Sequence, residues 1–159
     1  MRLVLLATVT LVGGCAPKPA WQSAKPETVV VTLERRPCFG RCPVYQVQLF
    51  QSGEVRYEGK TFVRHAGPAT VLLPPDTVKS LVAELRSGGY FELDEEYVAG
   101  SPGCGNYSTD SPTVVTSATS EGQTKRIQHD YGCSAAPPVL ARLERRIDEV
   151  AGTAQWTTP

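Results

Sequence analysis

The sequence predicts an α+β domain, a two-layer fold in which two helices pack on one face of an antiparallel β-sheet. Three observations predict this class. Short segments rich in β-branched and aromatic residues alternate apolar with polar side chains and are separated by glycine-containing turns. Two longer segments repeat apolar residues every three or four positions, which is typical of a helix with one buried face. Strands precede each helix, an order that favours antiparallel strands with helices laid on one side.

The first half of the chain contains the clearest strand patterns. In residues 44–50, Tyr45, Val47 and Leu49 alternate with glutamines, the pattern of a strand with one face in water. Gly53 then marks a hairpin turn. The expected strands of this half span residues 28–34, 44–50, 54–57 and 69–73, with a bend at Gly59 and a resumed strand over 61–63.

Two helices are predicted where apolar residues recur three or four positions apart. The first opens at Pro75 and ends at Gly88, because proline is tolerated in the first turn and glycine favours the end of a helix. The second begins near Pro138 and ends at Gly152. Their apolar faces contain Val78, Leu81, Val82 and Leu85 in the first helix and Leu140, Leu143, Ile147 and Val150 in the second.

Between the helices, a long turn-rich segment precedes a second hairpin. Residues 98–112 are irregular and contain several glycines and serines, a composition typical of loops that are functional or disordered. Strands are expected over 113–119 and 123–129. The folded domain is therefore predicted to span residues 28–152, and residues 153–159 are predicted to form a C-terminal tail.

The N-terminus resembles the export signal of a bacterial lipoprotein. A positive charge precedes an apolar run over residues 3–12, which is too short to span a bilayer. Small residues directly before Cys15 resemble the site at which signal peptidase II cleaves and the cysteine is acylated. The alternative, an ordinary signal that leaves Cys15 as a free thiol, is disfavoured because an unpaired exposed cysteine is a liability in a secreted chain.

The sequence accordingly predicts a signal peptide over residues 1–14 and a lipidated Cys15 at the start of a tether over 15–27. Acyl chains on Cys15 would attach the protein to a membrane. Ala16 follows the cysteine in place of the aspartate that resembles an inner-membrane retention signal. We therefore expect a lipid anchor in the cell envelope, in the outer membrane facing the periplasm.

Four cysteines remain after Cys15, and an even number in an oxidising compartment favours two disulfides. Three pairings are possible. We favour Cys38 with Cys42 and Cys104 with Cys133, because the second bond would fix the loop to the end of the strand that follows it. In the loop-entropy model this bond contributes about 3 to 4 kcal/mol, whereas the shorter one mainly fixes local shape.

A distinctive motif surrounds the first cysteine pair. It reads Cys38-Phe39-Gly40-x-Cys42-Pro43-x-Tyr45 and continues with Gly53, Val55, Tyr57 and Gly59. This motif resembles that of an uncharacterised bacterial domain family, a domain of unknown function common in lipoproteins. The resemblance covers residues 28–152. It implies no catalytic residue, and the pair Cys104 and Cys133 is an addition to the family pattern.

The first cysteine pair also supports an alternative chemistry. Cys38 and Cys42 resemble the copper-binding turn of Sco-type assembly proteins, and thiolates suit Cu(I). Either histidine of the chain, His65 or His129, would supply the third ligand. That turn leads into a helix, however, whereas residues 44–50 alternate as a strand. The sequence therefore predicts a structural disulfide, with thiol-redox or copper-binding activity as the alternative.

Composition and motifs favour a binding role over catalysis. Without residues 1–14 the chain has fifteen Lys and Arg against sixteen Asp and Glu, a net charge of −1, and no basic stripe for nucleic acid. No sequence motif of a serine hydrolase, a phosphate-binding loop or a zinc protease is present. We expect a non-catalytic module without a cofactor that binds an envelope protein or peptide. Arg41 in the cysteine turn and Tyr107 in the loop are the predicted contact residues.

Overall fold

The structure, a computed structural model, describes residues 28–158. The predicted signal peptide (1–14), the predicted lipidation site Cys15 and the tether (15–27) lie outside the described residues. Among the residues that are described, no helix is both long and apolar enough to cross a membrane.

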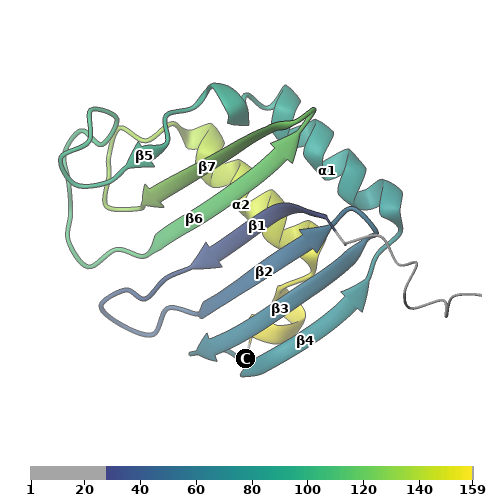
Figure 1. Cartoon of the computed structure of the whole chain (residues 1–159). Helices are drawn as coiled ribbons and strands as arrows, with labels where there is room; N and C mark the ends of the chain where they lie inside the picture. The colour runs from purple at the N-terminus through teal and green to yellow at the C-terminus, as the bar shows by residue number, and fades with distance from the viewer. Residues whose placement is uncertain (1–27, 159) are drawn as a thin grey trace, which may run out of the picture.

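Residues 28–158 form one seven-stranded sheet with helices on one of its faces (Figure 1). In chain order the strands are Val29–Arg35 (β1), Val44–Phe50 (β2), Glu54–Thr61 (β3), Gly67–Leu72 (β4), Glu96–Tyr97 (β5), Thr113–Ser120 (β6) and Gln123–Asp130 (β7). Their order across the sheet is β4-β3-β2-β1-β6-β7-β5. Neighbours are antiparallel except β5, which is parallel to β7. The predicted α+β class is confirmed.

The two predicted helices are present and share the same side of the sheet (Figure 1). Helix α1 spans Pro75–Ser87 and helix α2 spans Pro138–Ala151, so each begins with a proline, whose missing N–H is not needed in the first turn. Gly152 ends α2 in a left-handed conformation, with a φ of 67°. A 3₁₀ helix, η2, follows α1 at Tyr90–Glu92.

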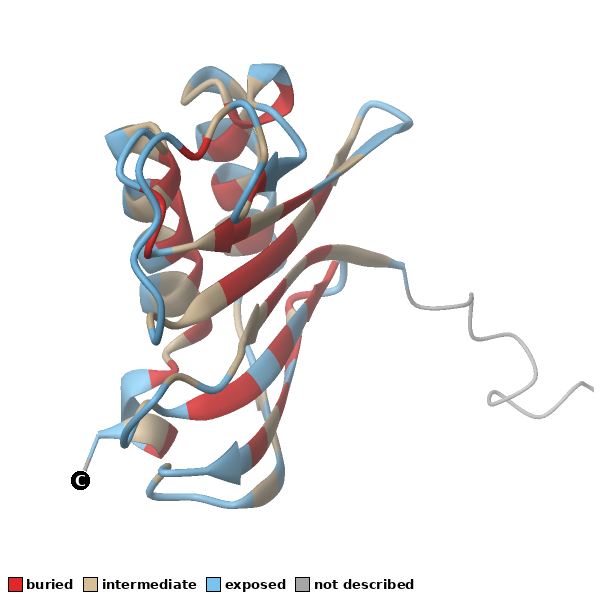
Figure 2. Ribbon diagram, turned by 90° about the vertical axis from the view of Figure 1, so that its left-hand side faces the viewer, coloured by how far each residue is buried: buried red, intermediate tan, exposed pale blue. Residues whose placement is uncertain are grey.

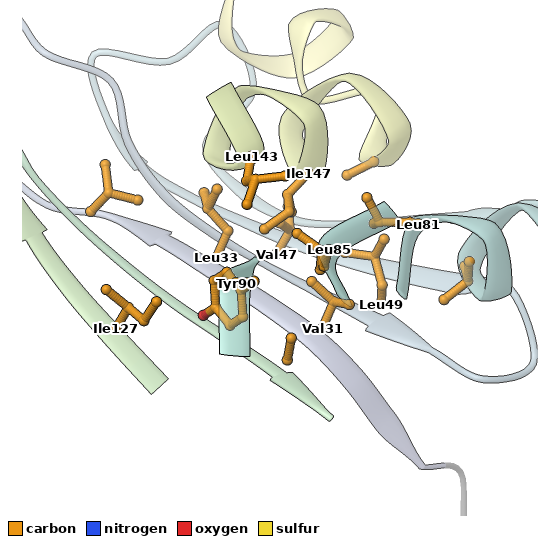
Figure 3. Packing of buried hydrophobic residues seen from close by; sticks show 14 of the residues in the cluster. Val31, Leu33, Val47, Leu49, Leu81, Leu85, Tyr90, Ile127, Leu143 and Ile147 are labelled. Atoms are coloured by element: carbon orange, nitrogen blue, oxygen red, sulfur yellow. The ribbon is translucent and has the colours of Figure 1, made fainter. Parts of the chain in front are cut away.

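The core lies between the sheet and these helices. In Figure 3 the side chains of β1 and β2 point toward those of α1 and α2, and Figure 2 shows the buried residues on the facing sides of both layers. The central members are fully buried because alternate strand residues and every third or fourth helix residue point into the same space. They include Val31, Leu33, Val47, Leu49, Leu81, Leu85, Tyr90, Ile127, Leu140 and Ile147.

Strand β3 is longer than the sequence predicts. It continues through Gly59, where a bend was expected, although its pairing with β2 shifts register between Gly59 and Thr61. A side chain at this position would place its Cβ 2.1 Å from the carbonyl oxygen of His65 and 2.6 Å from Tyr57 Oη. Glycine is therefore required by close packing of the β3–β4 turn, and it does not break the strand.

The structure corrects the prediction that residues 153–159 form a C-terminal tail. Residues 153–158 are part of the folded domain. Residues Ala154–Thr157 form a short helix, α3. The ring of Trp156 is buried and stacks on Tyr57, with 4.7 Å between ring centroids. The Trp156 carbonyl also accepts a hydrogen bond of 2.9 Å from the backbone N–H of His65. A single aromatic residue gives no periodicity, so the sequence offered no helical pattern here.

We expect Trp156→Ala to lower the free energy of unfolding by about 3 kcal/mol, because it removes a buried indole from its stack. Thr158→Ala, at an exposed position of the same segment, is the control and should change the free energy by less than about 0.5 kcal/mol. Denaturant unfolding followed by circular dichroism measures both variants. A Trp156→Ala protein as stable as the control would show that the segment is a tail after all.

Candidate functional site

The cysteine turn between β1 and β2 is closed by a disulfide. The sulfur atoms of Cys38 and Cys42 lie at bonding distance, and their Cα atoms are 5.8 Å apart. Gly40, between them, has a φ of 147°, which favours glycine. The turn joins Arg35, the last residue of β1, to Tyr45 in β2, and these two residues are direct partners in the ladder. The predicted pairing is the one present, and it closes the end of the central strand pair.

The turn presents an aromatic side chain to solvent. Phe39 is 87% exposed at the tip of the turn. The guanidinium of Arg41 lies over the ring of Phe62, 5.8 Å from its centroid, and Phe62 is itself 52% exposed in the neighbouring β3–β4 turn. We call Phe39, Arg41 and Phe62 the turn surface. Two exposed rings and an arginine are the residue types enriched where proteins bind one another.

Phe62 also adopts an unusual backbone conformation. Its φ is 54°, in the left-handed region that bulky side chains rarely occupy. Such a conformation costs on the order of 1 to 3 kcal/mol. Asp110 and Glu121, which lie in other turns, also have a positive φ, so this strain by itself does not single out the turn surface.

The loop over residues 98–112 is ordered and lies against the cysteine turn. The second disulfide joins Cys104 to Cys133, with an S–S distance of 2.03 Å. Tyr107 forms an isolated β-bridge with Cys133, and its hydroxyl donates to Asp130 Oδ2 at 3.1 Å. The backbone N–H of Phe39 donates to the carbonyl of Asp110 at 3.2 Å. The two disulfide-fixed segments thus meet at one end of the sheet (Figure 1).

The two predicted contact residues occupy different parts of this end. Arg41 belongs to the turn surface, whereas Tyr107 is 41% exposed in the adjacent loop. The Tyr107 hydroxyl is already held by Asp130, which raises the pKa of the Tyr107 phenol above its ordinary value. Tyr107 therefore presents the side of its ring, and its hydroxyl holds the loop in place.

The histidines of the alternative copper site have other partners. His65 is exposed in the β3–β4 turn, where its Nε2 lies 3.1 Å from the Pro68 carbonyl oxygen. His129 is buried on β7 beside Glu144. Within residues 28–158, no three His, Cys, Asp or Glu side chains are grouped so that they could hold a metal ion. The predicted set of Cys38 and Cys42 with either histidine is therefore not assembled in this structure.

A row of polar side chains crosses the helix-facing side of the sheet directly below the cysteine turn. The register places His129 beside Val114, Val114 beside Arg35, and Arg35 beside Tyr45. The next row inward is apolar at Ile127 and at its neighbours in β1 and β2. Alternation alone would make the first row apolar as well, so its polar residues need partners from the helix layer.

Helix α2 supplies these partners as two carboxylates one turn apart. Asp148 Oδ2 accepts hydrogen bonds from Arg35 Nε at 2.8 Å and Nη2 at 2.6 Å, and Asp148 Oδ1 accepts from Tyr45 Oη at 2.7 Å. Glu144, which is fully buried, lies 2.9 Å from His129 Nδ1 and accepts from Tyr131 Oη at 2.8 Å. We call these six residues the carboxylate cluster.

The electrostatics of the cluster follow from burial and opposite charge. Burial lowers the pKa of the Arg35 guanidinium, but the Asp148 carboxylate together with Tyr45 and Tyr131 outweighs this effect, so the pKa of Arg35 is raised. Burial raises the pKa of the Tyr45 phenol, and the Asp148 charge raises it further. Every buried side-chain nitrogen and oxygen among the described residues has a hydrogen-bond partner. Asp148 neutralises the charge of Arg35, and its hydrogen bonds to Arg35 and Tyr45 tie together the two strands that flank the turn.

Sequence reasoning missed this cluster, although a signal for it was present. In the sequence His129 was considered only as a possible third ligand of the alternative copper site, and Arg35 was not singled out. Glu144 lies on the apolar face of the predicted second helix, between Leu140 and Ile147, and Asp148 follows it by one turn. A carboxylate on a face that must be buried indicates a buried basic or hydroxyl partner.

A groove opens at the opposite end of the sheet, between the start of β1, helix α1 and the β6–β7 turn. Its volume is about 580 Å³. It is lined by the side chains of Val30, Val78, Val82, Lys79, Asp76 and Glu121, among others. None of the predicted site residues lines this groove, so it is separate from the turn surface.

We expect Asp148→Asn to lower the free energy of unfolding by about 2 to 4 kcal/mol, because it leaves the charge of Arg35 without its carboxylate. Glu149→Gln is the matched control, since Glu149 is exposed and pairs only at the surface with Arg146. Its effect should be below about 0.5 kcal/mol. Equal losses in denaturant unfolding would show that the cluster contributes no more than a surface ion pair.

The tyrosine of the cluster predicts a loss of stability in alkali. In the unfolded chain a phenol ionises near pH 10 (about its ordinary pKa), whereas folded Tyr45 keeps its proton to higher pH because its pKa is raised. The unfolded state therefore releases protons first, and stability that is complete below this pH falls as the pH rises above it. Tyr45→Phe should make the fall shallower in denaturant unfolding at a series of pH values. An unchanged slope would mean that Tyr45 does not contribute.

Comparison with known proteins identifies the chain at the level of its family. A search of curated proteins finds no match. The family model named "Domain of unknown function (DUF6438)" matches residues 29–151, a span that runs from β1 to the end of α2 and contains the cysteine turn and the carboxylate cluster. The chain therefore belongs to the DUF6438 family of domains of unknown function.

Proposed function

We propose that the protein is a non-catalytic, lipid-anchored module of the bacterial cell envelope that binds a protein or peptide through the turn surface. One observation carries this proposal, the 87% exposure of Phe39 on a turn closed by a disulfide. An aromatic side chain in water forgoes the stabilisation that burial would give it. Because the turn is already fixed, a partner that covers Phe39 would lose little conformational entropy in ordering it.

The surroundings of Phe39 support the same proposal. Arg41 and Phe62 extend the surface onto the neighbouring turn, and the carbonyl of Asp110 holds the turn from the loop side. Beneath it, Arg35 and Tyr45 are tied to Asp148, so that the base of the turn is also fixed. A rigid base under a small exposed aromatic group is the arrangement expected of a preformed contact site.

The described part of the chain begins at the other end of the sheet from this surface. Strand β1 begins at Val29, next to the proposed tether, and ends at Arg35, next to the cysteine turn. Its seven residues extend about 20 Å. A chain acylated at Cys15, in the outer membrane facing the periplasm, would therefore keep the turn surface clear of its point of attachment.

A photo-reactive amino acid placed at position 39 tests the proposal in cells. We expect ultraviolet light to attach a partner to the variant at position 39, and Phe62→Ser in the same protein to reduce the yield. The control carries the photo-reactive residue in place of Gln48, which is exposed on the open face of β2.

The two positions must give different products. The thermal unfolding midpoint of each variant shows whether it remains folded. Products that are the same at positions 39 and 48, or the absence of a product at position 39, would contradict the proposal.

A further inference from the structure

Strand β4 is the outermost strand on its side of the described sheet, and the direction of its backbone groups can be derived. The N–H of Leu73 donates to the carbonyl of Gly53 at 2.9 Å, so the residue directly after β4 faces β3. Backbone groups alternate along an antiparallel strand. Those of Gly67, Ala69 and Val71 therefore face β3 as well, and those of Pro68, Thr70 and Leu72 face outward.

The position of the proline agrees with this assignment. Pro68 has no N–H to donate to β3, so it fits a position whose backbone faces away from the sheet. The outward edge of β4 thus offers the carbonyls and N–H groups of Thr70 and Leu72. It also offers the Pro68 carbonyl, which already lies 3.1 Å from His65 Nε2 of the same chain and has one lone pair left for a second donor. In residues 28–158 no further strand pairs with this edge.

The edge lacks the charges that usually protect such a strand. No residue of Gly67–Leu72 is charged, and Leu72 is 73% exposed. Strand β7, on the other side of the sheet, has Lys125 and Arg126 in the part that the short strand β5 leaves uncovered. Charged residues on an edge strand discourage pairing with another chain. Strand β4 has no charge of this kind, and the one protective feature of its edge is Pro68.

From these observations we propose that β4 pairs with β4 of a second copy of the chain, antiparallel and with Thr70 opposite Thr70. In this register each Thr70 exchanges both of its outward hydrogen bonds with Thr70 of the other copy. Each Leu72 N–H donates to the carbonyl of Pro68 in the other copy. Pro68 then lies at the end of the ladder. Because it has no N–H, the Leu72 carbonyl opposite it bonds to water, and this is the only group of the ladder left without a protein partner.

The other registers that place an outward-facing residue opposite itself are less favourable. Pairing Pro68 with Pro68 would oppose two residues that cannot donate. Pairing Leu72 with Leu72 would bring Pro74, which precedes α1 and also lacks an N–H, into the ladder. The register centred on Thr70 uses strand residues alone, and it covers Leu72 with Pro68 of the second copy on the same face.

A second copy also fits the edge better than an unrelated peptide does. The same six residues supply donors, acceptors and an apolar side chain in a self-complementary order, as a two-fold interface requires. The chain has equal numbers of basic and acidic residues, so two copies do not repel one another strongly. The inference does not depend on the turn surface, and either can fail without the other.

Cysteine substitution in the full chain, produced in its own cell envelope, tests the pairing. Directly opposed residues of a hydrogen-bonded antiparallel pair have Cα atoms about 5.5 Å apart, within the range of a disulfide. We expect Thr70→Cys to form a covalent homodimer on a non-reducing gel. Gln48→Cys, exposed on the same face of β2, should remain monomeric. Adding Leu72→Lys to Thr70→Cys should greatly reduce the dimer.

Three results would overturn the proposal. One is a Thr70→Cys protein that forms no more homodimer than Gln48→Cys. Another is a homodimer whose yield Leu72→Lys leaves unchanged. The third is cross-linking of Thr70→Cys to a different protein, which would make β4 an edge for another chain. A circular dichroism melt of each variant separates loss of pairing from loss of folding.

Discussion

The arrangement of this domain depends on the contact between the two carboxylates of α2 and the polar row of the sheet. Asp148 binds Arg35 and Tyr45, which are cross-strand partners at the end of the central pair of strands. Glu144, one turn earlier, binds His129 on β7. A single helix therefore fixes the ends of three strands, and it fixes them where both disulfide-closed segments leave the sheet. Removing either side would leave a charge buried without its partner, which costs far more than an apolar contact of the same size.

This contact explains how an exposed aromatic turn can be held rigidly. The disulfide between Cys38 and Cys42 limits the shape of the turn, but a short covalent ring does not fix its direction relative to the sheet. The direction is set by Arg35 on one side and Tyr45 on the other, because both are bound to the same carboxylate. The carbonyl of Asp110 adds a third restraint from the loop. Covalent, ionic and backbone restraints thus converge on Phe39, which itself contacts solvent.

Periodicity in the sequence predicted most of the fold, because alternation and helical spacing report directly on which side of an element is buried. Strand β2, both main helices and the second hairpin were predicted within a residue or two of their bounds. The two-residue strand β5 and the four-residue helix α3 were not, since neither is long enough to show a period. The cysteine pairing was predicted correctly from the expectation that the second bond would fix the long loop to the end of the strand that follows it. The turn surface was predicted in part, through Arg41, whereas the contribution of Phe62 depends on a contact between two turns that no local pattern contains.

The carboxylate cluster was missed for a different reason. Glu144 on the apolar face of α2 indicates a buried partner, but only the sheet register shows that Arg35 and His129 belong to one row. The same register determines the geometry of the proposed pair of copies. Antiparallel pairing at β4 would place the two turn surfaces at opposite ends of the joined sheet, so the proposed pairing leaves both of them open to a partner.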